Sequence, residues 1–423
     1  MSSSPTLAEA VSCLSDYDPR ALKVADAQRV IERFVAPVEA VEQVAIRDAL
    51  ERVLAHDVIS PIDVPAHDNS AMDGYAVRAA DLRADGEAAL RVVGTAVAGK
   101  PLARELGPGE AVRIMTGAVM PAGADTVVTQ EVARQEGDLV HVPAGQQPGQ
   151  HRRLRGEDLA AGKPAIAGGK RLMPADLGLL ASLGVAEVPV RRRLRVAFFS
   201  TGDELRSIGE PLGPGQIYDS NRYTLHGMLR RLGVETIDMG VVGDSPEALE
   251  CAMRIAGESA DAIVSSGGVS VGEADFTRQV MARLGDVAFW TIGMRPGRPM
   301  AFGRVGNACY FGLPGNPVAV MITFYFFARD ALLRMMGARA SAQPYVRART
   351  ASAIRKRPGR TEYQRGVLSV AADGAMQVRL TGGQGSGVLR SMSEANCIVV
   401  LHHEQGEVAA GQTVDCLAFE GLI

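Results

Sequence analysis

The chain has 423 residues, which is too many for one ordinary core, so roughly two to four domains are expected. Hydrophobic residues make up 47% and charged residues 22%, a balance typical of globular proteins. The net charge of −3 lacks the basic excess of nucleic-acid binders, and 5% aromatic residues leave few platforms for stacked bases, so nucleic acid is not an expected partner.

The predicted location is the cytoplasm, with no membrane partner. The N-terminus lacks the basic stretch and apolar run of a secretory signal, and no apolar run approaches the ~20 residues of a membrane helix. Five scattered cysteines form no Cys-x-x-Cys pair, which argues against disulfide and zinc frameworks.

The first sixty residues are predicted to be mainly helical. Val30, Ile31 and Phe34 lie at helical spacing within residues 26–34, and residues 48–55 repeat that period.

A small β-rich module is expected from about residue 61 to residue 155. Short β-prone runs, such as 90–93 and 111–115, alternate there with Gly, Pro and Asp turns. Helical character returns at Pro174 and is expected to stop at Gly184.

Between residue 194 and about residue 338, apolar strands alternate with helical segments. This pattern predicts a parallel sheet with right-handed crossovers, in which ligands bind beyond the carboxyl ends of the strands. The strands are expected at 195–200, 235–241 and 261–266, and the helices at 221–232, 246–257 and 275–284. After about residue 340 the sequence again predicts a small β domain.

The segment Ser265–Asp275 follows the third of these strands and contains paired glycines, hydroxyls and two acids. Amides and serine oxygens of such a loop can hold an oxyanion, although a simple glycine turn before a helix is the alternative. Ser270 also matches the elbow of serine hydrolases. The downstream histidines, His402 and His403, fall in the separate C-terminal domain, which argues against a Ser270 nucleophile.

Acidic and polar residues follow other predicted strands as well. Asp203 and Glu204 follow the first strand, Asp219 and Asn221 lie in the next loop, and Asp244 follows the second strand. Neighbouring carboxylates can share a divalent cation beside phosphates, whereas each one alone also fits a helix N-cap. Their convergence at one edge of a sheet favours a ligand site.

The β-rich module holds further candidates. Asp73 is a candidate site residue, although its segment has the composition of a surface turn. Thr116 offers a hydroxyl before a glycine, which by itself indicates a ligand site only weakly. Residues 151–158 concentrate arginines next to Glu157 and Asp158. They suit a phosphate or another oxyanion, or else form a solvated basic face.

Two proline-containing turns flank a strand near residue 300. The first turn offers the guanidinium groups of Arg295 and Arg298. The second, at residues 312–317, is interpreted as architectural, with Asn316 capping a long helix through Phe326.

Six segments together resemble the molybdopterin molybdenumtransferase family, the bacterial MoeA proteins, which are similar to the E domain of gephyrin. Each segment is moderately specific, and six in order over nearly the whole chain are very specific. The segments are Asp68–Tyr75, Arg113–Gly117, Arg155–Asp158, Ser200–Leu205, Ser265–Asp275 and Gly312–Pro317.

The resemblance implies an α/β multidomain fold and an elongated homodimer. Its active cleft would lie between the β-rich module of one chain and the α/β molybdopterin-binding domain of the other. The implied parts are a discontinuous N-terminal linker and dimerisation domain (1–61 and 155–190), a β-rich insertion module (62–154), the α/β domain (191–338) and a C-terminal β domain (339–423).

The resemblance also implies a Mg²⁺-dependent activity in which adenylylated molybdopterin is hydrolysed, molybdate joins the dithiolene and AMP leaves. The catalytic residues carried over are Asp73, Thr116, Asp158, Glu204 and Asp275, and the metal ligands are Glu204, Asp244 and Asp275. The substrate-binding residues are Ser266, Gly267, Gly268, Ser270, Asp219, Asn221, Arg295, Arg298, Pro314 and Pro317. An adenylyltransferase and molybdoenzyme-maturation proteins would be further partners.

The chain departs from the family pattern at a few positions. Thr291 and Arg295 occupy a stretch where lysines are common, so an anion contact at Thr291 is lost. His67 replaces a bulky apolar residue. Two other functions stay open: an adenylyltransferase acting one step earlier, against which the extra β modules argue, and a gephyrin-like scaffold, against which the intact acidic set argues.

Overall fold

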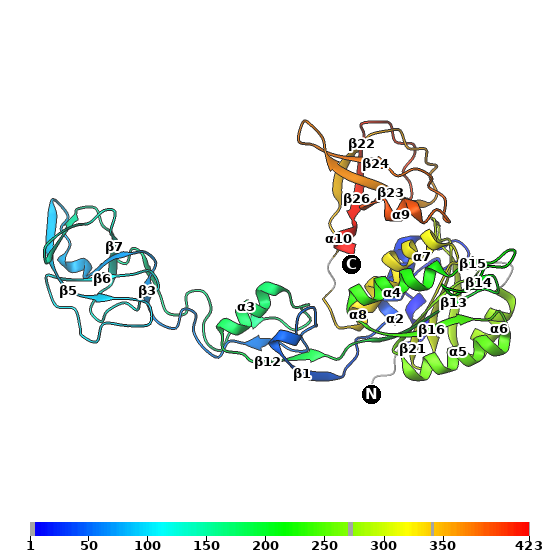
Figure 1. Ribbon diagram of the computed structural model, residues 1–423, viewed down its shortest axis with the longest axis horizontal. Coiled ribbons are helices and arrows are strands. Elements are labelled where there is room, and N and C mark those ends of the chain that lie inside the picture. Colours follow the sequence, from blue (N-terminus) through cyan, green and yellow to red (C-terminus); the bar gives the residue numbers. More distant parts are fainter. Residues whose placement is uncertain (1–4, 270–273, 340–341, 423) are drawn as a thin grey trace.

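The computed structural model describes residues 5–269, 274–339 and 342–422, with the backbone alone at 274–276 and 421–422. The chain is elongated: a β-rich module forms one end, and an α/β module and a C-terminal β module lie at the other (Figure 1). A narrow region with α3 (Pro174–Ser182), β1 (Val41–Ala45) and β12 (Glu187–Arg191) connects the two ends. The predicted α/β multidomain fold is confirmed.

The α/β module is built on a six-stranded sheet of order β16-β13-β17-β21-β20-β18. Its strands are β13 (Arg195–Thr201), β16 (Glu235–Val242), β17 (Ala262–Ser266), β18 (Gly285–Thr291), β20 (Pro299–Val305) and β21 (Ala308–Leu313). The first four strands in that order are parallel, as predicted, whereas β20 runs antiparallel to both of its neighbours, β21 and β18. Every residue of β17 and β21 is buried, because helices cover both faces of a parallel sheet.

Helices cover the two faces of this sheet in separate groups. Helix α4 (Ser220–Leu232) contributes to the core on one face, and α5 (Pro246–Ser259) and α6 (Ala274–Leu284) contribute to the core on the other. The three predicted helices are therefore confirmed, with ends shifted by at most two residues.

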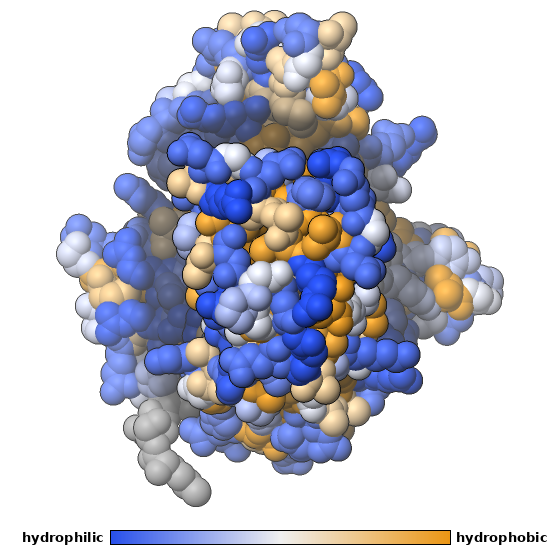
Figure 2. Space-filling view, turned by 90° about the vertical axis from the view of Figure 1, so that its left-hand side faces the viewer, coloured by the Kyte–Doolittle hydropathy of each residue, from blue (hydrophilic) through white to orange (hydrophobic). Residues whose placement is uncertain are grey.

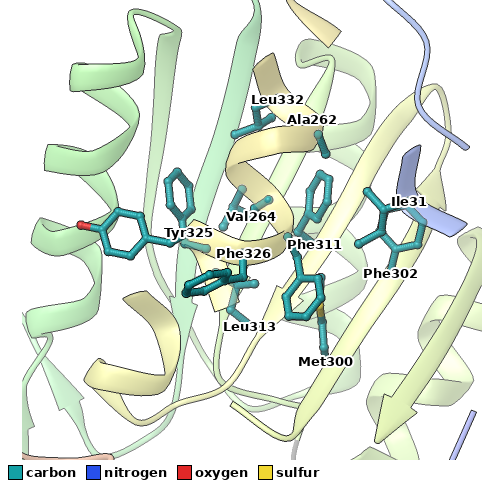
Figure 3. Packing of buried hydrophobic residues seen from close by; sticks show 14 of the residues in the cluster. Ile31, Ala262, Val264, Met300, Phe302, Phe311, Leu313, Tyr325, Phe326 and Leu332 are labelled. Carbon is teal, nitrogen blue, oxygen red and sulfur yellow. The ribbon is translucent and has the colours of Figure 1, made fainter. Parts of the chain in front are cut away.

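The largest core lies under a long helical run. This run consists of α7 (Pro317–Thr323), a π turn (Phe324–Ala328) and α8 (Arg329–Met335), so the predicted helix continues past Phe326. Figure 3 shows Phe326 and Leu332 of the run beside Val264 and Leu313 of the sheet, all buried. The predicted N-cap position of Asn316 is confirmed, and its carbonyl accepts the Val320 amide, although its side chain makes no cap hydrogen bond with a described residue. Pro317 begins the helix with its fixed φ.

Within the first sixty residues, the helical prediction is confirmed in one part and wrong in another. Helices α1 (Leu7–Val11) and α2 (Val24–Phe34) form, and α2 buries Val30, Ile31 and Phe34 as predicted. Residues 48–55 are not an α-helix. A 3-10 turn at Ile46–Asp48 is followed by Glu51 in the left-handed region, at φ 63°. Leu54 then forms a β-bridge with Val190, so its side chain is buried without a helix.

Helix α3 begins at Pro174 and ends before Gly184, which has φ 72°, so the predicted stop is confirmed. Asp176 is buried in its first turn and accepts hydrogen bonds from the Met173 amide and Lys170 Nζ.

The β-rich module has a six-stranded sheet of order β7-β4-β6-β5-β9-β8, with a separate apolar core on each face. Its strands are β4 (Gly74–Val77), β5 (Glu87–Ala96), β6 (Glu110–Ile114), β7 (Thr126–Thr129), β8 (Arg134–Glu136) and β9 (Leu139–Pro143), with a 3-10 turn at Ala79–Asp81. Two short antiparallel pairs connect it to the linker: β3 (Asn69–Ser70) with β10 (Arg152–Arg153), and β2 (Val58–Ile59) with β11 (Pro164–Ile166).

In the C-terminal module, pairing of β23 with both β24 and β25 closes the sheet into a small barrel. Its elements are β22 (Val346–Thr350), β23 (Thr361–Val370), β24 (Met376–Leu380), α9 (Arg390–Ser393), β25 (Cys397–Leu401), β26 (Thr413–Ala418) and α10 (Phe419–Leu422). Strand β19 (Met294–Arg295) of the preceding module pairs with β23 and so ties the barrel to the cleft edge of the α/β module.

The outer surface is mixed. In Figure 2 the free end of the β-rich module faces the viewer, and an apolar area lies near its centre among hydrophilic residues. Across the described ranges, no helix is long and apolar enough to cross a bilayer.

Candidate functional site

A cavity of about 980 Å³ opens beyond the carboxyl ends of β13, β17 and β21. Its position agrees with the general rule for open α/β sheets. The predicted residues that line it are Glu204, Asp219, Asn221, Asp244, Ser266, Gly267, Gly268, Arg295, Arg298, Pro314 and Pro317.

The positions of two predicted side chains, those of Ser270 and Asp275, are not described. Ser270 lies outside the described residues. Asp275 falls on the backbone of α6, and its side chain is also outside the described part of the chain.

The glycine loop after β17 is fixed by close backbone approach. A Cβ on Gly267 would lie 2.5 Å from the carbonyl oxygen of Thr201, and Gly267 and Gly268 have φ of 92° and 67°, so only glycine fits without strain. The Gly267 amide already donates to Leu313 O at 3.1 Å. This amide is therefore not available to bind an anion, so fewer backbone amides of the loop can take part in the predicted oxyanion site than the sequence suggested.

Buried hydroxyls connect this loop to α4. Ser266 Oγ donates to Ser200 Oγ at 3.1 Å, and Ser200 Oγ donates to Asp219 Oδ1 at 3.0 Å. The same Asp219 oxygen accepts the Arg222 amide at 3.1 Å and caps α4. Asp219 therefore fits both the helix-cap and the ligand-site interpretation of this loop, because it caps α4 and also lines the cavity.

Several buried oxygens at the cavity have no hydrogen-bond partner among the described residues: Thr201 Oγ1, Asp219 Oδ2 and Asn221 Oδ1. Asn221 Nδ2, in contrast, donates to Gly315 O at 2.7 Å, which fixes the amide with its oxygen unpaired. Buried polar atoms are normally satisfied, so these oxygens are suited to a ligand, water or cation.

Glu204 and Asp244 are exposed and line the cavity. A Cβ on Gly202 would lie 2.5 Å from Glu204 Oε2, so the carboxylate folds back over a glycine. Asp244 is not the cap of α5, because Ser245 occupies that position and accepts the Ala248 amide. Among the described side chains, no group of three or more His, Cys, Asp or Glu is placed to hold a metal ion.

Positive charge enters the cavity from two modules. Arg295 and Arg298 line it from the turn after β18, and Arg360 lines it from the C-terminal module, where its Nε donates to the buried Glu362 at 2.8 Å. Arg365 lies behind this wall, and burial, followed by repulsion from Arg295, lowers its pKa to about 10. Guanidinium groups in this arrangement can hold phosphate or another tetrahedral anion.

The contribution of the C-terminal module was missed in the sequence. Gln384, Gly385, Ser386, Gly387 and Leu389 line the cavity together with Arg360. The segment Gly382-Gly-Gln-Gly-Ser-Gly387 has the same glycine and hydroxyl composition as the loop after β17, and this composition could have indicated it.

The predicted residues of the β-rich module form a separate group. The backbone amide and the hydroxyl of Thr116 both donate to Asp73 Oδ1 at 2.7 Å, and these bonds lower the pKa of Asp73. Asp158 is exposed just beyond this module, where the chain returns to the linker, and its amide donates to Val64 O. The structure does not bring these residues to the cavity of their own chain, because the β-rich module lies at the far end of the molecule (Figure 1).

The basic stretch at 151–158 is largely paired within the module. Arg152 bonds to Asp68, and Arg155 Nε donates to Asp63 Oδ2 at 2.6 Å. These ion pairs favour a structural role for Arg152 and Arg155. His67 is exposed, and Thr291 lies at the end of β18, where its amide donates to Pro19 O.

Comparison with known proteins covers nearly the whole chain. Residues 22–184 match the MoeA N-terminal region (domains I and II), residues 197–334 match a probable molybdopterin-binding domain, and residues 347–419 match the MoeA C-terminal region (domain IV). The chain is 42% identical to the molybdopterin molybdenumtransferase of Haemophilus influenzae over 93% of its own length and 98% of that protein.

Two further relatives also match nearly the whole chain. A molybdopterin molybdenumtransferase of a Nostoc species is 38% identical, over 95% of this chain and 94% of that protein. The crystal structure of a molybdopterin biosynthesis MoeA protein from Pyrococcus horikoshii superposes with a TM-score of 0.82 at 28% identity, covering 95% of this chain and all (100%) of that one.

Proposed function

The chain belongs to the MoeA family, and from this premise we propose that it is a molybdopterin molybdenumtransferase, which inserts molybdate into adenylylated molybdopterin and releases AMP. The observation that carries the proposal is the cavity at the strand ends. Carboxylates from the segments after β13 and β16 and arginines from two modules face one space of about 980 Å³.

The two kinds of charge suit the two kinds of substrate group. Arg295, Arg298 and Arg360 would hold the anionic oxygens of molybdate and of the phosphates. Glu204 and Asp244 would act at the anhydride bond between the two phosphates, by holding a cation or by orienting the attacking water.

Magnesium is part of the proposal. Mg²⁺ is commonly held by one or two protein carboxylates, with water and substrate phosphates as its other ligands, so it does not need a group of three acidic side chains. Glu204 and Asp244 are exposed carboxylates that line this cavity, and Asp219 and Asn221 line it with unpaired oxygens, so the residues present fit such a site. When bound, the ion would neutralise phosphoryl charge and polarise phosphorus toward water.

A homodimer completes the proposed site. Asp73 and Thr116 lie on the β-rich module and Asp158 lies where that module joins the linker, away from the cavity of their own chain (Figure 1). The apolar area on the free end of that module supports docking against a second copy (Figure 2). We place the enzyme in the cytoplasm, with the adenylyltransferase and the maturation proteins as transient partners.

The test is incubation of the full chain with adenylylated molybdopterin and molybdate, with and without Mg²⁺. AMP release and reconstitution of a molybdenum-free apoenzyme are the expected results, and both should require Mg²⁺. If the chain instead adenylylates molybdopterin with ATP and ignores molybdate, the assignment is wrong. If neither reaction occurs, a scaffold role replaces it.

A further inference from the structure

Tyr218 supplies the one aromatic ring among the described residues that line the cavity. It belongs to β15 (Ile217–Tyr218), which pairs in parallel with β14 (Leu205–Arg206) at the cavity rim. Its side chain is 44% exposed although it lies in a wall made mostly of polar and glycine residues. An exposed ring in such a place needs an explanation.

The backbone of Tyr218 is held on both sides. The Ile217 amide donates to Glu204 O at 2.9 Å, and the Asp219 amide donates to Arg206 O at 3.0 Å. The next residue, Asp219, is buried and anchored as the cap of α4. The ring is therefore attached to a rigid point, next to the segment that carries Glu204.

The ring itself is also fixed. The Tyr218 hydroxyl donates to Glu210 O at 2.9 Å, so the phenol spans from β15 to the loop that precedes it. The residue fixed in this way at its backbone and at its hydroxyl lines the cavity and is partly exposed. Preorganised aromatic faces bind flat rings with little loss of side-chain freedom.

We propose that Tyr218 is the stacking residue for a planar nitrogen heterocycle of the substrate and so helps to set its specificity. This inference rests on the proposed function, because adenylylated molybdopterin contains two such rings, adenine and the pterin. The polar and cationic lining would bind the phosphates, and Tyr218 would supply the face that the rest of the wall lacks.

The test compares ligands that have a ring with one that does not. Binding of AMP, of molybdopterin without nucleotide and of ribose 5-phosphate is measured by calorimetry with Mg²⁺ present, for wild type, Tyr218→Ala and Tyr218→Phe. The alanine variant should lose about tenfold in affinity for a ring ligand, the order expected for one stacked ring, and should bind ribose 5-phosphate unchanged. The phenylalanine variant keeps the ring but loses the bond to Glu210 O, so it should lose less ring-ligand affinity than the alanine variant.

Tyr223 provides a matched control. It is 46% exposed on the first turn of α4 and is not among the described lining residues, so Tyr223→Ala should leave all three affinities unchanged. Loss confined to AMP assigns the adenine to Tyr218, and loss confined to molybdopterin assigns the pterin.

Two results would overturn the proposal while leaving the enzyme assignment intact: unchanged ring-ligand binding in Tyr218→Ala, or an equal loss for ribose 5-phosphate, which would show a damaged wall. If the wild-type chain binds neither AMP nor molybdopterin, the proposed function fails and the stacking role fails with it.

Discussion

Gly202 shows how a single residue sets the position of a functional group. It has φ 150°, and a Cβ there would lie 2.5 Å from Glu204 Oε2. The contact is with the end of a flexible side chain, so an added methyl group would move the carboxylate rather than break the fold.

Gly202→Ala should therefore lower the rate of AMP release by about 100-fold, the order found when a reacting group is misplaced by an ångström. Backbone strain should cost about 1–3 kcal/mol of stability. Gly209→Ala is the control, because Gly209 also has positive φ, at 91°, but a Cβ there would meet nothing within 4 Å. Equal activity in the two variants would argue against a role for the Glu204 position.

Asp73 and Thr116 form a second residue-scale test. The Thr116 amide, followed by its hydroxyl, lowers the pKa of Asp73 and favours the ionised form. The stabilisation that comes from this pair is thus present at neutral pH and is lost as the pH falls through the folded-state pKa. The carboxylate therefore stays charged at neutral pH.

Thr116→Val should raise the pKa of Asp73 only in part, because the backbone amide remains. A carboxyl titration by NMR measures this directly. Asp63 serves as the internal reference, since its pKa is lowered by Ala161 and Arg155 and should not move. No rise at Asp73 would mean that the hydroxyl bond at 2.7 Å does not form in solution.

At the scale of elements, the C-terminal glycine loop depends on Arg365. This residue is 1% exposed, and its guanidinium donates to Ser391 Oγ at 3.0 Å and to Gly385 O at 2.9 Å. The bond to Gly385 holds the segment that lines the cavity, and the bond to Ser391 holds α9, which follows that segment.

Arg365→Met should fill similar volume but release this loop, because a charged donor is lost from three acceptors, Gly383 O, Gly385 O and Ser391 Oγ. Hydrogen exchange followed by mass spectrometry should show faster exchange of amides 383–387, with the barrel strands unchanged. Arg379→Met, on the exposed side of β24, is the control. Slow exchange in the Arg365 variant would show that the loop is held by other contacts.

The elements differ in how far sequence could predict them. The parallel strands were predictable because burial on both faces leaves a continuous apolar run, as in β17. The irregular segment at 48–55 was not predictable, because its apolar spacing also fits a helix. Only the left-handed Glu51 and the bridge from Leu54 to Val190 exclude the helix. The part of the cavity wall from Gln384 to Leu389 depends on the pairing of β19 with β23, a long-range contact that no local pattern contains.

At the scale of the whole molecule, the elongated shape separates two sets of predicted site residues. Glu204 lies at the cavity, and Asp73 lies on the β-rich module at the opposite end (Figure 1). A narrow connection through β1 and β12 joins the two ends, so one chain cannot bring the sets together without large rearrangement. In a dimer of two antiparallel copies, the β-rich module of each copy could lie at the cavity of the other. Twofold symmetry would then form the same site at both ends of the dimer.

This arrangement predicts complementation between inactive variants. Asp73→Asn and Glu204→Gln should each abolish AMP release, because every site in either homodimer lacks one group. After mild dissociation and remixing at equal amounts, about half of the dimers should be mixed, and each mixed dimer should hold one intact site, giving about a quarter of wild-type activity. If each site is instead built from one chain, remixing restores nothing, and native mass spectrometry with one variant isotopically labelled confirms whether exchange has occurred.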